Sequence, residues 1–323
     1  MIVQTPDLIS VITPCYNASA YLPRLLDSVL KQDYPRVEMI CVDDGSTDQT
    51  YETVMSYQDR FLDRGYTLRY VSQEHSGQAR ALSTGLSLIN GEFLIWPDSD
   101  DFFWSKAMLS MMREAILKAD ARHQISRCRS RYLRESDMGL IRETILDRYF
   151  MQEDLFEDCL LSRNHFLWGA GNYMVRVSAL RKVLPKEGIY CNPYAGQNAQ
   201  ILLPMLWSYK CVPVPEVLHC IVKRAHSHGA SFQKSCEDEL FRADIHEEVF
   251  LRTIQNIPSM SKEQLTRYEQ ELRNDTLVQK ARSIFLHGHY KEYFRYMRAM
   301  RFPMVRKVRL FLGHVKSAII HNT

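Results

Sequence analysis

The sequence lacks any long apolar run and any strong excess of one charge. It holds 41 Lys and Arg against 38 Asp and Glu, a formal net charge of +3, so its charge does not indicate nucleic acid as a partner. No window approaches about 18 uncharged apolar residues, and no segment is therefore expected to span a bilayer. Residues 1–8 include Pro6 and Asp7 but no apolar stretch, which argues against a secretory signal. We expect a globular protein in the cytoplasm.

Two kinds of binding motif are also lacking. The 8 cysteines are scattered without a Cys-x-x-Cys pair, so we expect reduced, mostly buried thiols and no zinc site or disulfide framework. There is no Gly-x-x-x-x-Gly-Lys loop, and no Gly-x-Gly-x-x-Gly follows the first expected strand, which argues against a P-loop enzyme and against dinucleotide binding. With these glycine-rich phosphate-binding loops absent, a nucleoside diphosphate could still be bound through a metal ion.

The first third of the chain alternates short apolar strands with helices. Strands are expected over 8–13, 37–42, 68–71 and 93–96. Helices are expected over 22–30, from Ser46 or Thr47 to about 64, and over 77–89. This β-α repetition predicts an α/β fold in which helices cover a parallel sheet.

The remainder of the chain is less regular until it becomes helical. Residues 121–165 show no period that can be assigned, and residues 166–222 hold short apolar pieces divided by Gly and Pro. Helices are expected over 237–257, 261–286, 288–300 and 303–320. We therefore divide the chain into an α/β domain over 1–230 and a helical extension over 231–323.

Three polar clusters follow expected strands, at 13–17, 42–46 and 97–101. Each alone is more often a turn, a helix cap or a solvated loop. Because ligands of open parallel sheets bind beyond the carboxyl ends of the strands, three clusters at one edge indicate a binding site. Asp98 and Asp100 flank a single residue, so their carboxylates can share one hard cation, Mn²⁺ or Mg²⁺, completed by water and substrate phosphates.

Residues 9–101 resemble the family 2 glycosyltransferases of the GT-A fold. The matching segments are 10–17, 42–48, 77–79 and 91–101. A weaker likeness continues through Arg224 and through residues 196–204, which are similar to a bacterial subgroup with a Gly-Gln-Asn-x-Gln-x-Leu-Leu-Pro segment. The resemblance implies a Rossmann-like nucleotide-diphospho-sugar transferase fold: a mixed, mostly parallel sheet flanked by helices, here with a C-terminal helical extension.

The resemblance also implies roles for individual residues. Tyr16 would pack on the nucleoside base and Asp44 would accept a hydrogen bond from it, with Asp43 near the ribose. The residues expected to bind the nucleotide sugar are Thr13, Pro14, Tyr16, Asn17, Asp43, Asp44, Gly77, Gln78, Asp98, Ser99, Arg224, His226 and His228. The expected metal ligands are Asp100, Asp98 and His226.

One departure from the family concerns catalysis. Many members carry a Glu-Asp pair, whose Asp is the general base, where this chain has Gln197 and Asn198. An amide is not basic at neutral pH, and a base contributes roughly 10²–10⁴-fold to rate. Asn198, Gln197 and Asp100 remain the expected catalytic residues, with Asn198 orienting the acceptor. The base would then be another group, or the metal and the leaving diphosphate would account for more of the rate.

The expected reaction is transfer of a monosaccharide from a nucleoside diphosphate sugar, UDP-linked, to a glycan or lipid-linked acceptor. The resemblance implies inversion at the anomeric carbon and a place in bacterial surface polysaccharide synthesis. Two alternatives stay open. Gln197 and Asn198 are compatible with a non-catalytic sugar-nucleotide-binding protein. A sugar nucleotidyltransferase would need a loop rich in Gly and Lys or Arg after the first strand, where residues 14–17 do not supply one.

The helix expected over 303–320 has two interpretations. An apolar face is shared by five residues, and four cations lie to its other side. The apolar residues are Val305, Val308, Leu312, Val315 and Ile319, and the cations are Arg306, Lys307, Arg309 and Lys316. Packing on its own domain is the simpler interpretation. The alternative is a helix that lies on an anionic membrane, where each cation near the surface adds about 1 kcal/mol. That alternative would place the protein peripherally on the inner face of the membrane.

Overall fold

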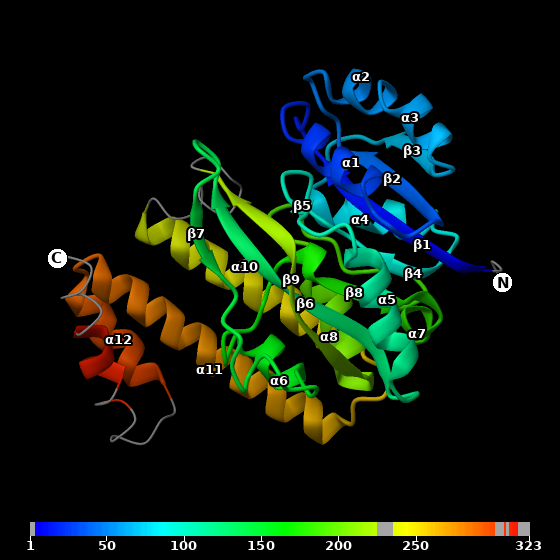
Figure 1. Cartoon of the computed structure of the whole chain (residues 1–323). Helices are drawn as coiled ribbons and strands as arrows, with labels where there is room; N and C mark the ends of the chain where they lie inside the picture. The colour runs from blue at the N-terminus through cyan, green and yellow to red at the C-terminus, as the bar shows by residue number, and fades with distance from the viewer. Residues whose placement is uncertain (1–3, 225–234, 301–306, 308–309, 316–323) are drawn as a thin grey trace. The chain divides into compact units, whose positions relative to one another are not determined.

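The computed structural model describes residues 4–224, 235–300, 307 and 310–315 (Figure 1). The chain divides into two compact units: residues 1–224 with 256–259, and residues 225–255 with 260–323. The boundary that we expect at residue 230 lies outside the described residues. His226 and His228, expected to bind the nucleotide sugar, also lie outside them.

The first unit is built on one mixed sheet, with strand order β3-β2-β1-β4-β8-β6-β9-β5 and with β7 paired to β6. Its N-terminal half is formed by β1 (Thr5–Cys15), β2 (Val37–Asp43), β3 (Thr67–Ser72) and β4 (Gly91–Ile95). These four strands are parallel, and every residue of β2 is buried. Because both faces of these strands are buried, their sequences are short continuous apolar runs.

The second half of the sheet comes from the region without an assignable sequence period. Its strands are β5 (Phe102–Phe103), β6 (His123–Arg134), β7 (Leu140–Glu143), β8 (Tyr173–Arg176) and β9 (Lys210–Lys223). Strand β8 is antiparallel to both β4 and β6, whereas β9 runs parallel to β6 from one end to the other. The prediction of a mixed sheet flanked by helices is confirmed.

Helices cover both faces of the parallel strands. The helices of this unit are α1 (Leu22–Leu30), α2 (Thr50–Met55), α3 (Gln58–Asp63), α4 (Gln78–Leu86), α5 (Met108–Lys118), α6 (Phe156–Leu160), the 3₁₀ turn η1 (Ala170–Asn172), α7 (Val177–Val183) and α8 (Ala199–Ser208). The leucines of α1 join a core with Val11 and Met39. Helix α4 lies against Ile12 and Val42, which point to the opposite face because strand residues alternate.

The helix expected from Ser46 or Thr47 to about 64 is wrong in its start and its continuity. It begins at Thr50 and is divided into α2 and α3 by a turn at residues 56 and 57. Neither Ser46 nor Thr47 caps it, because both bond to the neighbouring strand-end loop instead. Asp48 Oδ1 holds the start of α2 by accepting from the amide and hydroxyl of Thr50, at 3.0 and 2.5 Å.

The described part of the second unit is helical, as expected. It contains α10 (Cys236–Gln255), α11 (Lys262–Leu286) and α12 (Tyr290–Ala299), and α11 begins with a capping box between Ser261 and Gln264. Of the last expected helix, residues 307 and 310–315 are described and helical, and Leu310, Phe311 and Val315 pack on the core of this unit. No described helix is both long and apolar enough to cross a membrane.

Candidate functional site

The loops that follow β1 and β2 are bonded to each other at the edge of the sheet. The Asn17 amide donates to Ser46 Oγ at 2.9 Å, and the Thr47 amide donates to Asn17 Oδ1 at 2.8 Å. Asn17 has a φ of +48°, a left-handed conformation that Asn adopts more readily than most residues. Thr13 and Pro14 are buried in β1, so Tyr16 and Asn17 are the exposed residues of this cluster.

Asp43 is buried, and both of its carboxylate oxygens are occupied. Oδ1 accepts from the amide and the hydroxyl of Ser46 at 2.9 and 2.5 Å, and Oδ2 accepts from the Tyr70 hydroxyl at 2.5 Å. Burial and this bond to Asp43 raise the pKa of Tyr70. Asp43 therefore fastens the loop after β2 to the neighbouring strand β3.

Asp44 organises the loop over residues 73–77. Its Oδ1 accepts from Gln73 Nε2 at 2.6 Å and from the Ser76 amide at 3.0 Å, and its Oδ2 accepts from the Gly77 amide at 2.8 Å. His75 Nδ1 lies 3.0 Å from the same Oδ2. A carboxylate offers about four acceptor positions. The hydrogen bond that we expect from a nucleobase to Asp44 would therefore have to replace one of these donors.

An aromatic pair that the sequence pattern did not indicate lies beside Asp44. The rings of Tyr16 and His75 are stacked, with centroids 4.3 Å apart and an interplanar angle of 29°. Tyr16 is 50% exposed, so its ring is accessible to a planar ligand. His75 carries no sequence signal, because a single histidine in a loop between a strand and a helix has no characteristic spacing.

Gly77 is required by its backbone and by its neighbour. Its φ is +91°, and a Cβ atom there would lie 2.7 Å from Pro193 Cα. Only glycine combines that conformation with such a close backbone approach. The segment around Pro193, far along the chain, is thereby held against the start of α4, from which Gln78 extends.

Asp98 joins three distant parts of the chain. Its Oδ1 accepts from Gln78 Nε2 at 2.7 Å and from Gln197 Nε2 at 2.8 Å. Burial and the negative charge of Asp100 raise the pKa of Asp98 to about 7. The structure therefore brings together Asp98, Gln78 and Gln197, which the sequence predicts at one site.

Asp100 is paired with the cation at the end of β9. Arg224 Nε and a terminal guanidinium nitrogen lie 2.7 and 2.6 Å from Asp100 Oδ2. The same guanidinium lies over the Tyr21 ring, 4.2 Å from its centroid. Asp100 and Arg224 are 124 residues apart in sequence. They thus meet, together with Asp98, just beyond the end of β4.

Asp101 holds the end of β9, the strand that leads to Arg224. It is buried and its Oδ1 accepts from the Val222 amide at 3.0 Å, which fixes the end of β9 just before Arg224. His219 Nε2 lies 3.9 Å from Asp101 Oδ2. Burial lowers the pKa of His219 to about 3, and burial and Asp100 raise the pKa of Asp101 well above its usual value. Both side chains are held away from solvent.

Asn198 is anchored by two tryptophans. Its Nδ2 donates to the Trp168 carbonyl at 2.6 Å, and its Oδ1 accepts from Trp96 Nε1 at 3.1 Å. Trp96 is buried and lies two residues before Asp98. Asn198, at the start of α8, is thereby attached to the strand that carries the Asp98–Asp100 pair, and Trp96 and Trp168 are contacts that the sequence pattern did not indicate.

The acidic pair fits a divalent cation in part. Among the described residues, no group of three or more His, Cys, Asp or Glu is arranged to hold a metal ion, and His226 lies outside them. Asp98 and Asp100 supply two carboxylates; burial and the negative charge of Asp100 raise the pKa of Asp98, and a bound cation would favour its ionised form. Mg²⁺ is commonly held by one or two carboxylates together with substrate phosphates. Ser99 lies half-buried between the two.

A protein-family model described as "Glycosyl transferase family 2" matches residues 10–184. The chain is 36% identical over 116 residues to the glycosyltransferase GlyG of Streptococcus pneumoniae, covering 36% of this chain and 37% of that protein. It is 39% identical over 111 residues to the putative teichuronic acid biosynthesis glycosyltransferase TuaG of Bacillus subtilis, covering 34% and 42%. The chain thus matches less than half the length of these relatives.

Two solved structures share the fold. Staphylococcus aureus TarS 1-349 in complex with UDP-GlcNAc has a TM-score of 0.55 and 18% identity, covering 85% of this chain and 82% of that one. The mannosyltransferase PcManGT from Pyrobaculum calidifontis, in complex with GDP-Man and Mn²⁺, has a TM-score of 0.57 and 17% identity, covering 96% and 80%. Identity this low is evidence for the fold alone.

Proposed function

The chain belongs to glycosyl transferase family 2, and from this premise we propose that it transfers a monosaccharide from a nucleoside diphosphate sugar to a glycan or lipid-linked acceptor. One observation carries the proposal. Asp98 and Asp100, at the end of a parallel strand, receive Gln78, Gln197 and Arg224 from three distant segments. Such a polar cluster at the carboxyl edge of an open sheet is where ligands bind in folds of this kind.

The donor would lie across the edge from Tyr16 to Arg224. The exposed Tyr16 ring supports stacking on a uracil base, and Asn17, Asp43, Asp44 and the 73–77 loop would surround the nucleoside. The solved complexes of TarS with UDP-GlcNAc and of PcManGT with GDP-Man support a nucleotide-sugar donor. We favour UDP as the nucleotide of this chain's donor.

Charge at the diphosphate would be balanced by this chain and by a cation. Asp98 and Asp100 would hold Mn²⁺ or Mg²⁺, which supplies positive charge for the departing diphosphate. Arg224 would donate to phosphate oxygens, as arginine does with a planar fork of N–H groups. Gln78 and Gln197 would keep the Asp98 carboxylate in one orientation for this purpose.

The amide pair in place of a Glu-Asp pair supports a variant design of the site. Gln197 donates a hydrogen bond to Asp98, and an ionised Glu at this position could not donate. Asn198 would orient the acceptor hydroxyl, with the proton taken by another group or by the leaving diphosphate. Inversion at the anomeric carbon and a role in surface polysaccharide synthesis are part of the proposal, and the likeness to TuaG supports the second.

A titration of UDP in the presence of Mn²⁺ tests the donor site. Asp100→Ala should abolish the UDP-stimulated binding of Mn²⁺ with an unchanged circular dichroism spectrum. Asp59→Ala is the control, because Asp59 is an exposed residue of α3. Equal calorimetric titrations for Asp100→Ala and the wild type would overturn the metal site. Equal affinity of the wild type for UDP, CDP and GDP would overturn the choice of uracil.

A donor panel tests catalysis itself. Wild-type protein incubated with Mn²⁺ and several sugar nucleotides should release the nucleoside diphosphate slowly by hydrolysis, even without an acceptor. Tight binding of UDP with no turnover on any donor–acceptor pair would favour the binding-only alternative. Release of pyrophosphate from a nucleoside triphosphate and a sugar phosphate would instead identify a nucleotidyltransferase.

A further inference from the structure

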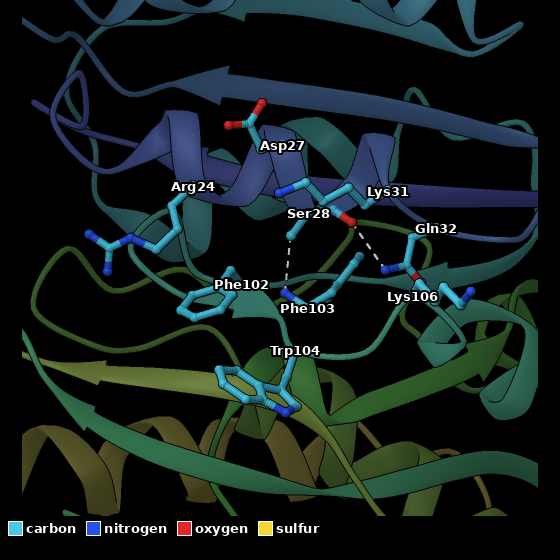
Figure 2. Close-up of a pocket in the computed structure, with 9 residues that line it drawn as sticks. All are labelled: Arg24, Asp27, Ser28, Lys31, Gln32, Phe102, Phe103, Trp104 and Lys106. Atoms are coloured by element: carbon cyan, nitrogen blue, oxygen red, sulfur yellow. Dashed lines mark hydrogen bonds between the residues drawn. The ribbon is translucent and has the colours of Figure 1, made fainter. Parts of the chain in front are cut away.

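A second pocket lies between α1 and the residues that follow Asp101 (Figure 2). Its volume is about 360 Å³, within the range of small-molecule sites. One wall is α1 with the two residues after it, including Arg24 and Lys31, and the other is the segment from Phe102 to Lys106. No residue of this pocket has a role in the donor site described above.

The wall after Asp101 presents aromatic rings. Figure 2 shows Phe102 and Trp104 on the same side of the pocket, and their ring centroids are 6.2 Å apart with an interplanar angle of 47°. Trp104 is 45% exposed, which is unusual for the largest apolar side chain. The segment is held in place because the Phe103 amide donates to Ser28 Oγ at 3.1 Å. The Arg131 guanidinium lies over one face of Trp104, 4.3 Å from the ring centroid, and the Arg24 guanidinium lies 5.8 Å from the Phe102 centroid. The remaining exposed surface of these rings is flat and apolar and can pack on a ligand.

The pocket also carries unbalanced positive charge. Arg24, Lys31 and Lys106 line it, and within the described part of the chain no ion pair is formed by any of them. The acidic residue of the lining, Asp27, is paired with Arg60 at 2.8 Å, and in Figure 2 its carboxylate points away from the two aromatic rings. Cations concentrated in a concave site raise the local concentration of anionic ligands.

From these observations we infer that the pocket binds an anionic saccharide unit of the acceptor chain. The rings would pack on the C–H face of a sugar, and the cations would select a unit that carries a carboxylate or a phosphodiester. We assign the pocket to the acceptor because Phe102 follows directly after Asp101, which links one wall of the pocket to the acidic loop of the candidate donor site. This inference rests on the proposed transferase function and specifies the chemical class of its acceptor.

Binding of short saccharides to the full-length protein tests the inference. The probes are a trimer of galacturonic acid, a trimer of glycerol phosphate and the neutral trisaccharide maltotriose, titrated by calorimetry at low salt. At least one anionic trimer should bind, at least tenfold more tightly than maltotriose, and its identity shows whether carboxylate or phosphodiester is preferred. Equal binding of maltotriose, or no binding of either anionic trimer, would overturn the inference.

Variants of exposed residues assign the binding to this pocket. The double variant Lys31→Gln with Lys106→Gln should weaken binding of the anionic trimer at least tenfold, and Trp104→Ala should weaken it similarly. The matched control is Lys182→Gln with Lys186→Gln, which removes the same charge from exposed positions elsewhere in the unit. Because Lys31 and Lys106 are exposed, their replacement should not affect folding. If Lys31→Gln with Lys106→Gln binds the anionic trimer as tightly as the wild type, the trimer binds elsewhere and the assignment is refuted.

Donor hydrolysis separates this inference from the proposed function, because hydrolysis by water needs no acceptor. The Lys31→Gln with Lys106→Gln protein should hydrolyse the sugar nucleotide at the wild-type rate. If the wild type hydrolyses donor but binds no anionic trimer, the pocket inference fails alone. If it binds the trimer at this pocket but turns over no donor with any acceptor, the transferase proposal fails alone.

Discussion

Replacing Gln78 with leucine should shift the pH at which Asp98 becomes able to hold a metal ion. Gln78 Nε2 donates to Asp98 Oδ1 at 2.7 Å, and this bond favours the ionised carboxylate. Hydrogen bonds to charged groups contribute about 1.5–3 kcal/mol, and one pKa unit corresponds to about 1.4 kcal/mol. Because Asp98 is half-buried and water can replace part of the bond, we take the lower end, a rise of about one unit.

The assay is the pH dependence of Mn²⁺ affinity in the presence of UDP. The pKa of Asp98 is about 7 in the wild type, and protons compete with the metal for the carboxylate. Affinity should therefore be constant above that pH and fall about tenfold for each unit below it. In Gln78→Leu the midpoint should lie about one unit higher, near pH 8.

The control is Gln124→Leu, because the Gln124 amide donates to the Ala121 carbonyl, away from the acidic pair. Its midpoint should coincide with that of the wild type. An unshifted midpoint in Gln78→Leu would refute the reasoning. A uniform loss of affinity at every pH would also refute it, since it would mean that Gln78 contacts the ligand without tuning Asp98.

Three further predictions concern the frame of the site and the C-terminal unit. Gly77→Ala should lower the free energy of unfolding by at least about 2 kcal/mol in a denaturant titration, because it combines a positive φ with a Cβ atom 2.7 Å from Pro193 Cα. Asn198→Asp should lower both the transfer rate and the melting temperature, because a carboxylate cannot donate to the Trp168 carbonyl; the lost bond is worth about 1 kcal/mol. Deletion of residues 303–323 should lower the melting temperature, because Leu310, Phe311 and Val315 pack on the core, and should leave binding to anionic vesicles unchanged.

Each of these predictions has an outcome that contradicts it. Gly65 has a similar φ of +75°, but a Cβ atom added there would meet no neighbouring atom within 4 Å, so Gly65→Ala should cost less than Gly77→Ala. Equal costs would mean that the contact with Pro193 is unimportant. A faster Asn198→Asp enzyme would indicate that proton removal limits the rate. Loss of vesicle binding at an unchanged melting temperature, after deletion of 303–323, would favour the membrane-bound helix.

Much of the fold follows from local pattern. The strands β1 to β4 are recognisable because burial on both faces demands unbroken apolar runs, and α1 because its leucines recur at helical spacing. The helices α10, α11 and α12 begin and end within two residues of their predicted limits, because their residues follow the helical period over at least ten positions. The predicted start of α2 is wrong, because Ser46 and Thr47 have the chemistry of a cap but bond to a neighbouring loop.

The pairing of strands β5 to β9 could not be predicted from local sequence pattern. Strand β6 pairs with β9 along its whole length, from His123 opposite Lys210 to Arg134 opposite Lys223. These partners are more than 80 residues apart, and a strand's neighbour depends on the packing of the whole sheet and not on its own residues. The same region contains short strands such as β5 and β8, whose two to four residues are too few to show a period.

What the sequence by itself determined is the chemical content of the site and the sheet edge that carries it. Because the ends of parallel strands meet at one edge, the residues after β1, β2 and β4 had to converge. The tertiary structure alone decided which side chains meet there: Gln197 with Asp98, and Arg224 with Asp100. It also decided that Asp44 holds a loop of backbone amides, because hydrogen-bond partners depend on distances in space that residue order does not specify.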